Sequence, residues 1–148
     1  LNFCKKKFNQ FVLVVGDSHA LDLFNSVSKV SNYEFIVGLI NYGCRPSILE
    51  CNYDKILNFV EQNKNNIKKT IVTTKGSFYL TNIGNPRNEN YTPARKLPLL
   101  ENEIIGSISF YKKLNNISNI VYFGPHIEPN IEVTKNLMNN LINTPLRK

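Results

Sequence analysis

The sequence contains no tryptophan, one methionine, two histidines and three cysteines among its 148 residues. It also lacks any apolar run near the roughly 20 residues that a membrane-spanning helix needs. Residues 1–10 contain lysines with no long apolar segment behind them, so they do not resemble a secretory signal peptide. Since the chain starts with Leu1, we expect it to be a piece of a longer protein. Metal binding is not expected, because histidines and cysteines at zinc spacing are missing.

The chain also has few acidic residues, and its formal net charge is +7. Such a charge would suit nucleic acid, but no Arg-rich segment or set of stacking aromatics accompanies it. The lysines instead form short separate groups, so we expect no nucleic-acid partner; these groups are Lys5–Lys7, Lys68–Lys69 and Lys112–Lys113. With 42% hydrophobic residues, a globular fold is expected.

Strand-like and helix-like patterns alternate along the chain, which predicts a parallel sheet covered on both faces. We therefore expect an α/β fold with three layers (α/β/α), a mostly parallel central sheet, and one domain over residues 1–148. Residues 76–98 are rich in Gly, Asn and Pro and read as irregular. The expected strands are 11–15, 33–40, 69–75 and 119–124, and the expected helices are 19–30, 53–67, 99–116 and 130–143.

The stretch "FVLVVGDSHALDLFNSV" (residues 11–27) places a serine where a buried strand meets a helix. Ligands of parallel sheets collect at the carboxyl ends of the strands, and unpaired N–H groups at a helix start favour negative charge. Ser18 could therefore attack an acyl carbon while nearby N–H groups hold the oxyanion. Gly16 would permit a tight turn, and Asp17 could shape the loop. The alternative is that Ser18 only caps the helix, as serines often do.

Three motifs resemble the SGNH (GDSL-like) hydrolase superfamily, and more specifically the SGNH domain fused to acyltransferase-3 membrane domains in bacterial polysaccharide O-acyltransferases. The first is Gly-Asp-Ser-His at the end of the first strand. The second is "YGCRPSILECNYDKILNFVEQNKNNIKKTIVTTKGSFYL", similar to a Cys-Pro-Pro segment followed by a cysteine, a helix and a strand. The third is "NIVYFGPHIEP", similar to a strand followed by Gly-Pro-x-x-Glu.

This resemblance implies a flavodoxin-like SGNH fold, incomplete at its C-terminus, with Ser18 as nucleophile and no cofactor. It suggests Gly43 and Asn82 as oxyanion donors, with Asn85 as a substitute for the latter. It implies an extracytoplasmic domain that takes an acyl group, delivered by a membrane domain, to a glycan acceptor. A carbohydrate esterase, or a non-catalytic domain that binds a glycan or a partner, are the alternatives.

The spacing of Cys44 and Cys51 is similar to that of the extracytoplasmic family, in which a disulfide would suit an oxidising compartment. Two unrelated thiols are the alternative, and Cys4 has no obvious mate. Arg45 departs from the Cys-Pro-Pro pattern.

The Asp-x-x-His motif that carries the superfamily's base is absent from the chain. His126 falls in the variable part of the Gly-Pro segment, and His19 is expected to be structural, with Asp22 within reach. Because a serine without a base is a poor nucleophile, we expect these 148 residues alone to be nearly inactive.

Overall fold

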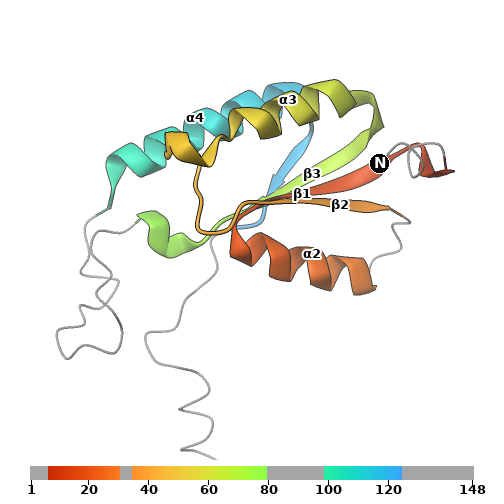
Figure 1. Cartoon of the computed structure of the whole chain (residues 1–148), viewed down its shortest axis with the longest axis horizontal. Helices are drawn as coiled ribbons and strands as arrows, with labels where there is room; N and C mark the ends of the chain where they lie inside the picture. The colour runs from red at the N-terminus through yellow and green to blue at the C-terminus, as the bar shows by residue number, and fades with distance from the viewer. Residues whose placement is uncertain (1–6, 31–34, 80–98, 125–148) are drawn as a thin grey trace, which may run out of the picture.

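The computed structural model describes residues 7–30, 35–79 and 99–124, and its centre is a parallel sheet (Figure 1). Every strand pairing among these residues is parallel, and the strand order is β2-β1-β3-β4. The predicted parallel α/β sheet is therefore confirmed. The strands are β1 (Phe11–Gly16), β2 (Ile36–Ile40), β3 (Ile67–Thr73) and β4 (Ile120–Tyr122).

Helices cover both faces of the sheet, which confirms the three-layer arrangement (Figure 1). Helix α2 (Ser18–Val30) lies on one face. Helices α3 (Asp54–Asn63) and α4 (Glu101–Ile117) lie together on the other. Short 3-10 turns complete the described elements: η1 (Leu49–Cys51), η2 (Lys64–Asn66) and η3 (Gly76–Tyr79).

The element boundaries differ most from the sequence prediction between α3 and β3. The helix predicted over 53–67 ends at Asn63, whose side-chain amide donates to the Phe59 carbonyl within the last turn. Asparagine competes with the helix backbone in this way, and the chain passes through η2 into β3 two residues earlier than expected. The segment 76–98, read as irregular, begins with the turn η3.

Strand β1 is buried along its whole length because it lies between β2 and β3 under helices on both sides. Phe11, Leu13 and Val15 belong to a core cluster that includes Val60 of α3 and Leu114 of α4. Side chains alternate along a strand, so Val12 and Val14 face the α2 layer. The continuous apolar run is thus explained by burial on two faces.

The last residue of β1, Gly16, has no room for a side chain. Its φ is +152°, and a Cβ added there would lie 1.8 Å from the Thr73 carbonyl oxygen and 2.9 Å from the Ala20 Cβ. The backbone of β3 and the Ala20 side chain of α2 are therefore packed directly against the strand end at this point.

We predict that Gly16→Ala destabilises the fold by about 3 kcal/mol or more, because strain at positive φ adds to an overlap with backbone. Gly43→Ala is the matched control. Gly43 also has a positive φ of 66°, but open space surrounds the position of its Cβ, so about 1 kcal/mol is expected. Urea unfolding of both variants measures the difference. Equal losses would contradict the close packing at Gly16.

Candidate active site

Ser18 is the first residue of α2 and is exposed, whereas Asp17 before it is completely buried. The Asp17 Oδ1 atom accepts a hydrogen bond from the His19 N–H at 2.9 Å. Its backbone carbonyl accepts one from the Ala20 N–H at 3.0 Å. A side-chain bond to the second helical N–H defines the residue that caps a helix. The N-cap of α2 is therefore Asp17.

The other carboxylate oxygen of Asp17 binds the chain that leaves the neighbouring strand, β3. Oδ2 accepts the Lys75 N–H at 2.7 Å, just beyond the end of β3. The Nδ1 atom of His19 lies 3.6 Å from Oδ1 of the same carboxylate. One buried side chain thus joins the end of β1, the start of α2 and the end of β3.

Because Asp17 caps the helix, the Ser18 side chain is not used for that purpose. Its hydroxyl makes no hydrogen bond to any residue that the structure describes. An exposed hydroxyl therefore lies beside the first N–H groups of α2, where a developing negative charge is favoured.

The position of Ser18 within the sheet is also favourable for a ligand. The connection that leaves β1 runs through α2 on one face to β2, whereas the connection that leaves β3 runs through α4 on the other face to β4 (Figure 1). Crossovers to opposite faces leave a crevice outside the carboxyl ends of β1 and β3, where ligands of open α/β sheets bind. Asp17 and Ser18 lie at this edge.

The chain leaving β2 forms a turn at the same edge. The Asn41 N–H donates to the Gly16 carbonyl at 2.8 Å, and the Cys44 N–H closes a turn onto the Asn41 carbonyl at 3.1 Å. Gly43, third in the turn, has the positive φ that a type II turn requires. Ser18 follows Gly16 by two residues, and Gly43 follows Asn41 by two residues. The hydrogen bond between Asn41 and Gly16 therefore joins the two chain segments just before Ser18 and Gly43. The Gly43 N–H is exposed and donates to none of the described residues.

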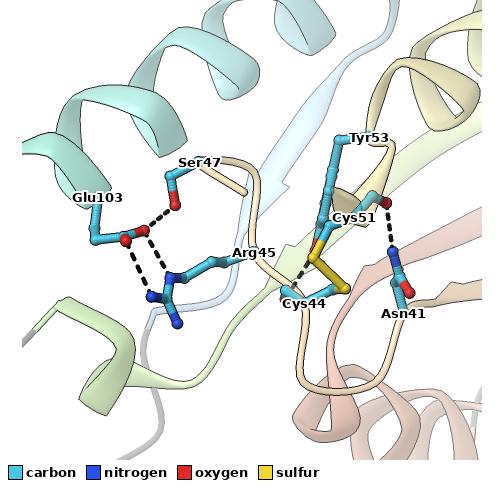
Figure 2. The surroundings of a disulfide bond; sticks show 7 residues. All are labelled: Asn41, Cys44, Arg45, Ser47, Cys51, Tyr53 and Glu103. Carbon is cyan, nitrogen blue, oxygen red and sulfur yellow. Dashed lines mark hydrogen bonds and ion pairs between the residues drawn. A yellow bond between two sulfur atoms is a disulfide. The ribbon is translucent and has the colours of Figure 1, made fainter. Parts of the chain in front are cut away.

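A disulfide between Cys44 and Cys51 closes the loop that follows, as the resemblance implied (Figure 2). Two hydrogen bonds hold this loop from either side. The Asn41 amide Nδ2 donates to the Cys51 carbonyl at 2.7 Å, and the Tyr53 hydroxyl donates to the Cys44 carbonyl at 3.2 Å. Burial raises the pKa of Tyr53, and the negative charge of Asp17 raises it further, so this hydroxyl stays a donor.

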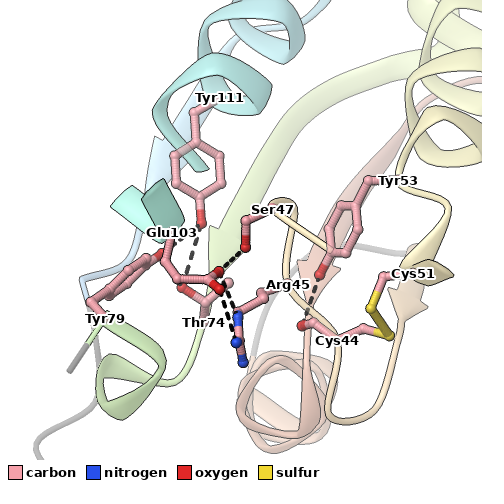
Figure 3. Close-up of polar contacts among 9 residues, drawn as sticks. All are labelled: Cys44, Arg45, Ser47, Cys51, Tyr53, Thr74, Tyr79, Glu103 and Tyr111. Atoms are coloured by element: carbon pink, nitrogen blue, oxygen red, sulfur yellow. Dashed lines mark hydrogen bonds and ion pairs between the residues drawn. A yellow bond between two sulfur atoms is a disulfide. The ribbon is translucent and has the colours of Figure 1, made fainter. Parts of the chain in front are cut away.

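The same loop is joined to α4 by a polar cluster that the sequence did not indicate (Figures 2 and 3). Arg45 forms a two-pronged ion pair with Glu103, with its Nε 2.6 Å from Oε2 and its Nη2 3.0 Å from Oε1. The Ser47 hydroxyl also donates to Glu103. Gly106 on α4 admits this loop, because a Cβ there would lie 2.9 Å from the Ser47 Cα. The presence of a glycine inside this helix is thus explained by packing.

Three hydroxyl groups gather just past the end of β3 (Figure 3). The Thr74 hydroxyl lies 3.1 Å from that of Tyr79 and 3.4 Å from that of Tyr111, and the two tyrosine hydroxyls are 3.3 Å apart. Burial raises the pKa of Tyr111, so the group remains neutral.

A hollow of about 300 Å³ lies between the disulfide loop and the helices α3 and α4. Neither Ser18 nor Gly43 lines it, so it is separate from the edge described above. Its lining comprises Pro46, Ser47, Ile48, Leu49, Asn52, Tyr53, Asp54, Leu57, Gly106, Ser109, Phe110 and Lys113.

Several predicted features lie outside the described residues: Asn82, Asn85, His126 and the helix expected over 130–143. Within residues 7–30, 35–79 and 99–124, no group of three or more potential ligands could hold a metal ion. No helix in these ranges is both long and apolar enough to cross a bilayer.

Comparisons of the chain with protein-family models, curated proteins and solved structures found no match.

We predict that Asp17→Asn destabilises the protein by about 2 to 4 kcal/mol, because an amide replaces a buried carboxylate that accepts two backbone N–H groups. The NH₂ group of Asn would meet one of those donors. Asp22→Asn, an exposed change on the same helix, should shift stability by less than about 0.5 kcal/mol. Urea unfolding of the two variants makes the comparison, and similar small shifts would show that Asp17 is not the cap.

Loss of the Cys44–Cys51 bond should cost about 2.5 kcal/mol, the chain entropy of closing so short a loop. We expect Cys44→Ala/Cys51→Ala to lose this much in urea unfolding, with a Cys4→Ser background to keep the third cysteine out of the measurement. In the Cys4→Ser protein that retains Cys44 and Cys51, iodoacetamide should modify neither cysteine when the protein is unfolded without reductant. After reduction it should modify both. Alkylation before reduction would contradict the disulfide.

Proposed function

We propose that this chain is an SGNH-type serine acyl-transfer domain, from the extracytoplasmic side of a bacterial surface-glycan O-acyltransferase. Ser18 Oγ attacks the carbonyl carbon of an acyl group, most simply acetyl, that a membrane domain of the full-length protein delivers. The tetrahedral intermediate expels the donor's leaving group and leaves an acyl-Ser18 ester. A sugar hydroxyl then attacks this ester and releases Ser18.

The proposal is supported by one observation: the side chain of Asp17, and not that of Ser18, caps helix α2. If Ser18 were present only as a cap, its hydroxyl would accept a bond from the helix backbone. Asp17 does this instead, and the exposed Ser18 hydroxyl lies at the start of α2, at the sheet edge where ligands bind. This arrangement favours a nucleophile over a cap.

The developing oxyanion needs N–H donors that have no other partner. The N–H groups of Ser18 and Gly43 both fit this requirement among the described residues, because neither donates a bond there. They belong to neighbouring strand ends joined by the Asn41–Gly16 hydrogen bond. Donors held by rigid backbone stabilise an oxyanion without reorganising during the reaction.

The proton of Ser18 requires a base. His19 is the one histidine within the described ranges, and its Nδ1 lies beside Asp17. We assign the base to an Asp-x-x-His segment of the full-length protein, as the resemblance implies. It accepts the Ser18 proton during acylation and passes it to the departing group of the donor. During transfer it takes the proton of the sugar hydroxyl and returns it to Ser18 Oγ.

The disulfide supports the proposed location. Disulfides persist in oxidising compartments such as the periplasm and are rare in the cytosol. Cys44 and Cys51 form one next to the proposed site, which favours a domain on the outer side of the membrane. The choice of a sugar over water as acceptor rests on the resemblance.

The test is covalent labelling of the full-length protein with a fluorophosphonate. Such a probe reacts when a serine hydroxyl displaces fluoride from phosphorus, and it needs both a base and an oxyanion hole. We expect one probe to attach at Ser18, located by mass spectrometry of the labelled peptide, and Ser18→Ala to abolish it.

The control is Ser28→Ala, which removes another exposed serine of α2 and should leave labelling unchanged. An unlabelled Ser18 in the folded full-length protein would favour the non-catalytic alternative. Labelling together with release of free acetate, and no transfer to sugar, would favour the esterase.

A further inference from the structure

We propose that Asn41 is a positioning residue, whose side-chain amide holds the Gly43 turn in register with Ser18. This inference rests on the proposed function, since it concerns the oxyanion donor that the turn supplies. Asn41 lies directly after β2, two residues before Gly43.

Asn41 uses its backbone and its side chain for three separate bonds. Its N–H donates to the Gly16 carbonyl at 2.8 Å, next to the loop that carries Ser18. Its carbonyl accepts the Cys44 N–H at 3.1 Å, which forms the turn around Gly43. Its Nδ2 donates to the Cys51 carbonyl at 2.7 Å. The first two bonds use the backbone and would be available to any residue except proline. The third requires the side-chain amide.

Because of this third bond, the loop is closed twice, by the disulfide and by a hydrogen bond from Asn41 (Figure 2). The disulfide joins Cys44, at the end of the turn, to Cys51, and the Asn41 amide joins the start of the turn to the carbonyl of the same Cys51. Both ends of the Gly43 turn are thus fastened to one residue. Cys51 itself is buried in the core cluster, so the turn is held against the rigid part of the molecule.

The position of this turn matters because the Gly43 N–H has to lie about 2.7–3.1 Å from the oxyanion. Tyr42 and Gly43 in the middle of the turn are exposed, and nothing lies within 4 Å of a Cβ added at Gly43, so packing does not hold this part of the turn in place. Without the Asn41 amide, the turn keeps the disulfide but loses its second attachment. Attack by Ser18 should then slow, whereas binding of the probe should change little.

The experiment measures fluorophosphonate labelling of the full-length protein as two quantities, the maximal inactivation rate and the probe concentration at half that rate. We expect Asn41→Ala and Asn41→Asp to lower the maximal rate about 10- to 100-fold, less than the loss of a whole oxyanion donor. The half-maximal concentration should stay within about twofold. Asn41→Asp keeps the size of the side chain but replaces the donor with a carboxylate, so Asn41→Ala is the variant that removes the donor without adding a charge.

The matched control is Asn63→Ala. Asn63 is also buried, and its amide also donates to a backbone carbonyl, that of Phe59 at 2.6 Å. It lies at the end of α3, before β3 begins, whereas Ser18 and Gly43 follow the ends of their strands. Rates are divided by the folded fraction of each variant from urea unfolding, so a loss of stability alone does not count. Asn63→Ala should label at the wild-type rate.

The outcomes separate this inference from the proposed function. An unlabelled wild-type Ser18 would overturn the proposed function itself. A labelled wild type with Asn41 variants at the same maximal rate would overturn only the role of Asn41. An equal loss in Asn63→Ala would overturn it too, since any buried amide would then have the same effect.

Discussion

The buried carboxylate of Asp17 is the interaction on which the arrangement of this edge depends. A charged group away from water is costly unless its oxygens are hydrogen-bonded, and both oxygens of Asp17 accept backbone N–H groups. Each bond joins a different element to the end of β1. The carboxylate therefore fixes where α2 begins and how the chain leaves β3, and it leaves the next residue, Ser18, turned to the solvent.

Gly16 makes this convergence possible. The Thr73 carbonyl and the Ala20 side chain occupy the space that any Cβ would fill, so β3 and α2 approach the end of β1 more closely than other residues allow. The sheet topology supplies the other condition, because crossovers to opposite faces open a crevice at this edge. Backbone packing and topology together place an exposed hydroxyl beside helix N–H groups.

The strands and helices were predictable from the sequence because they depend on local periodicity. The run from Phe11 to Val15 reads as a strand buried on two faces, and it is one. The cap was harder, since Asp17 and Ser18 are both common at helix starts and only geometry tells which side chain turns inward. The Arg45–Glu103 pair joins residues 58 positions apart, and no local pattern encodes such a contact.

The disulfide loop is held by attachments of several kinds. Cys51 is buried in the core cluster, and Cys44 and Ile48 pack against it, whereas the other residues between them are partly buried or exposed. A covalent bond, an ion pair to α4 and the amide of Asn41 also hold the loop. These attachments reduce the conformational entropy of the turn during folding. Under the proposed function, the Gly43 N–H would be ordered in advance and would not have to be ordered again in each transition state.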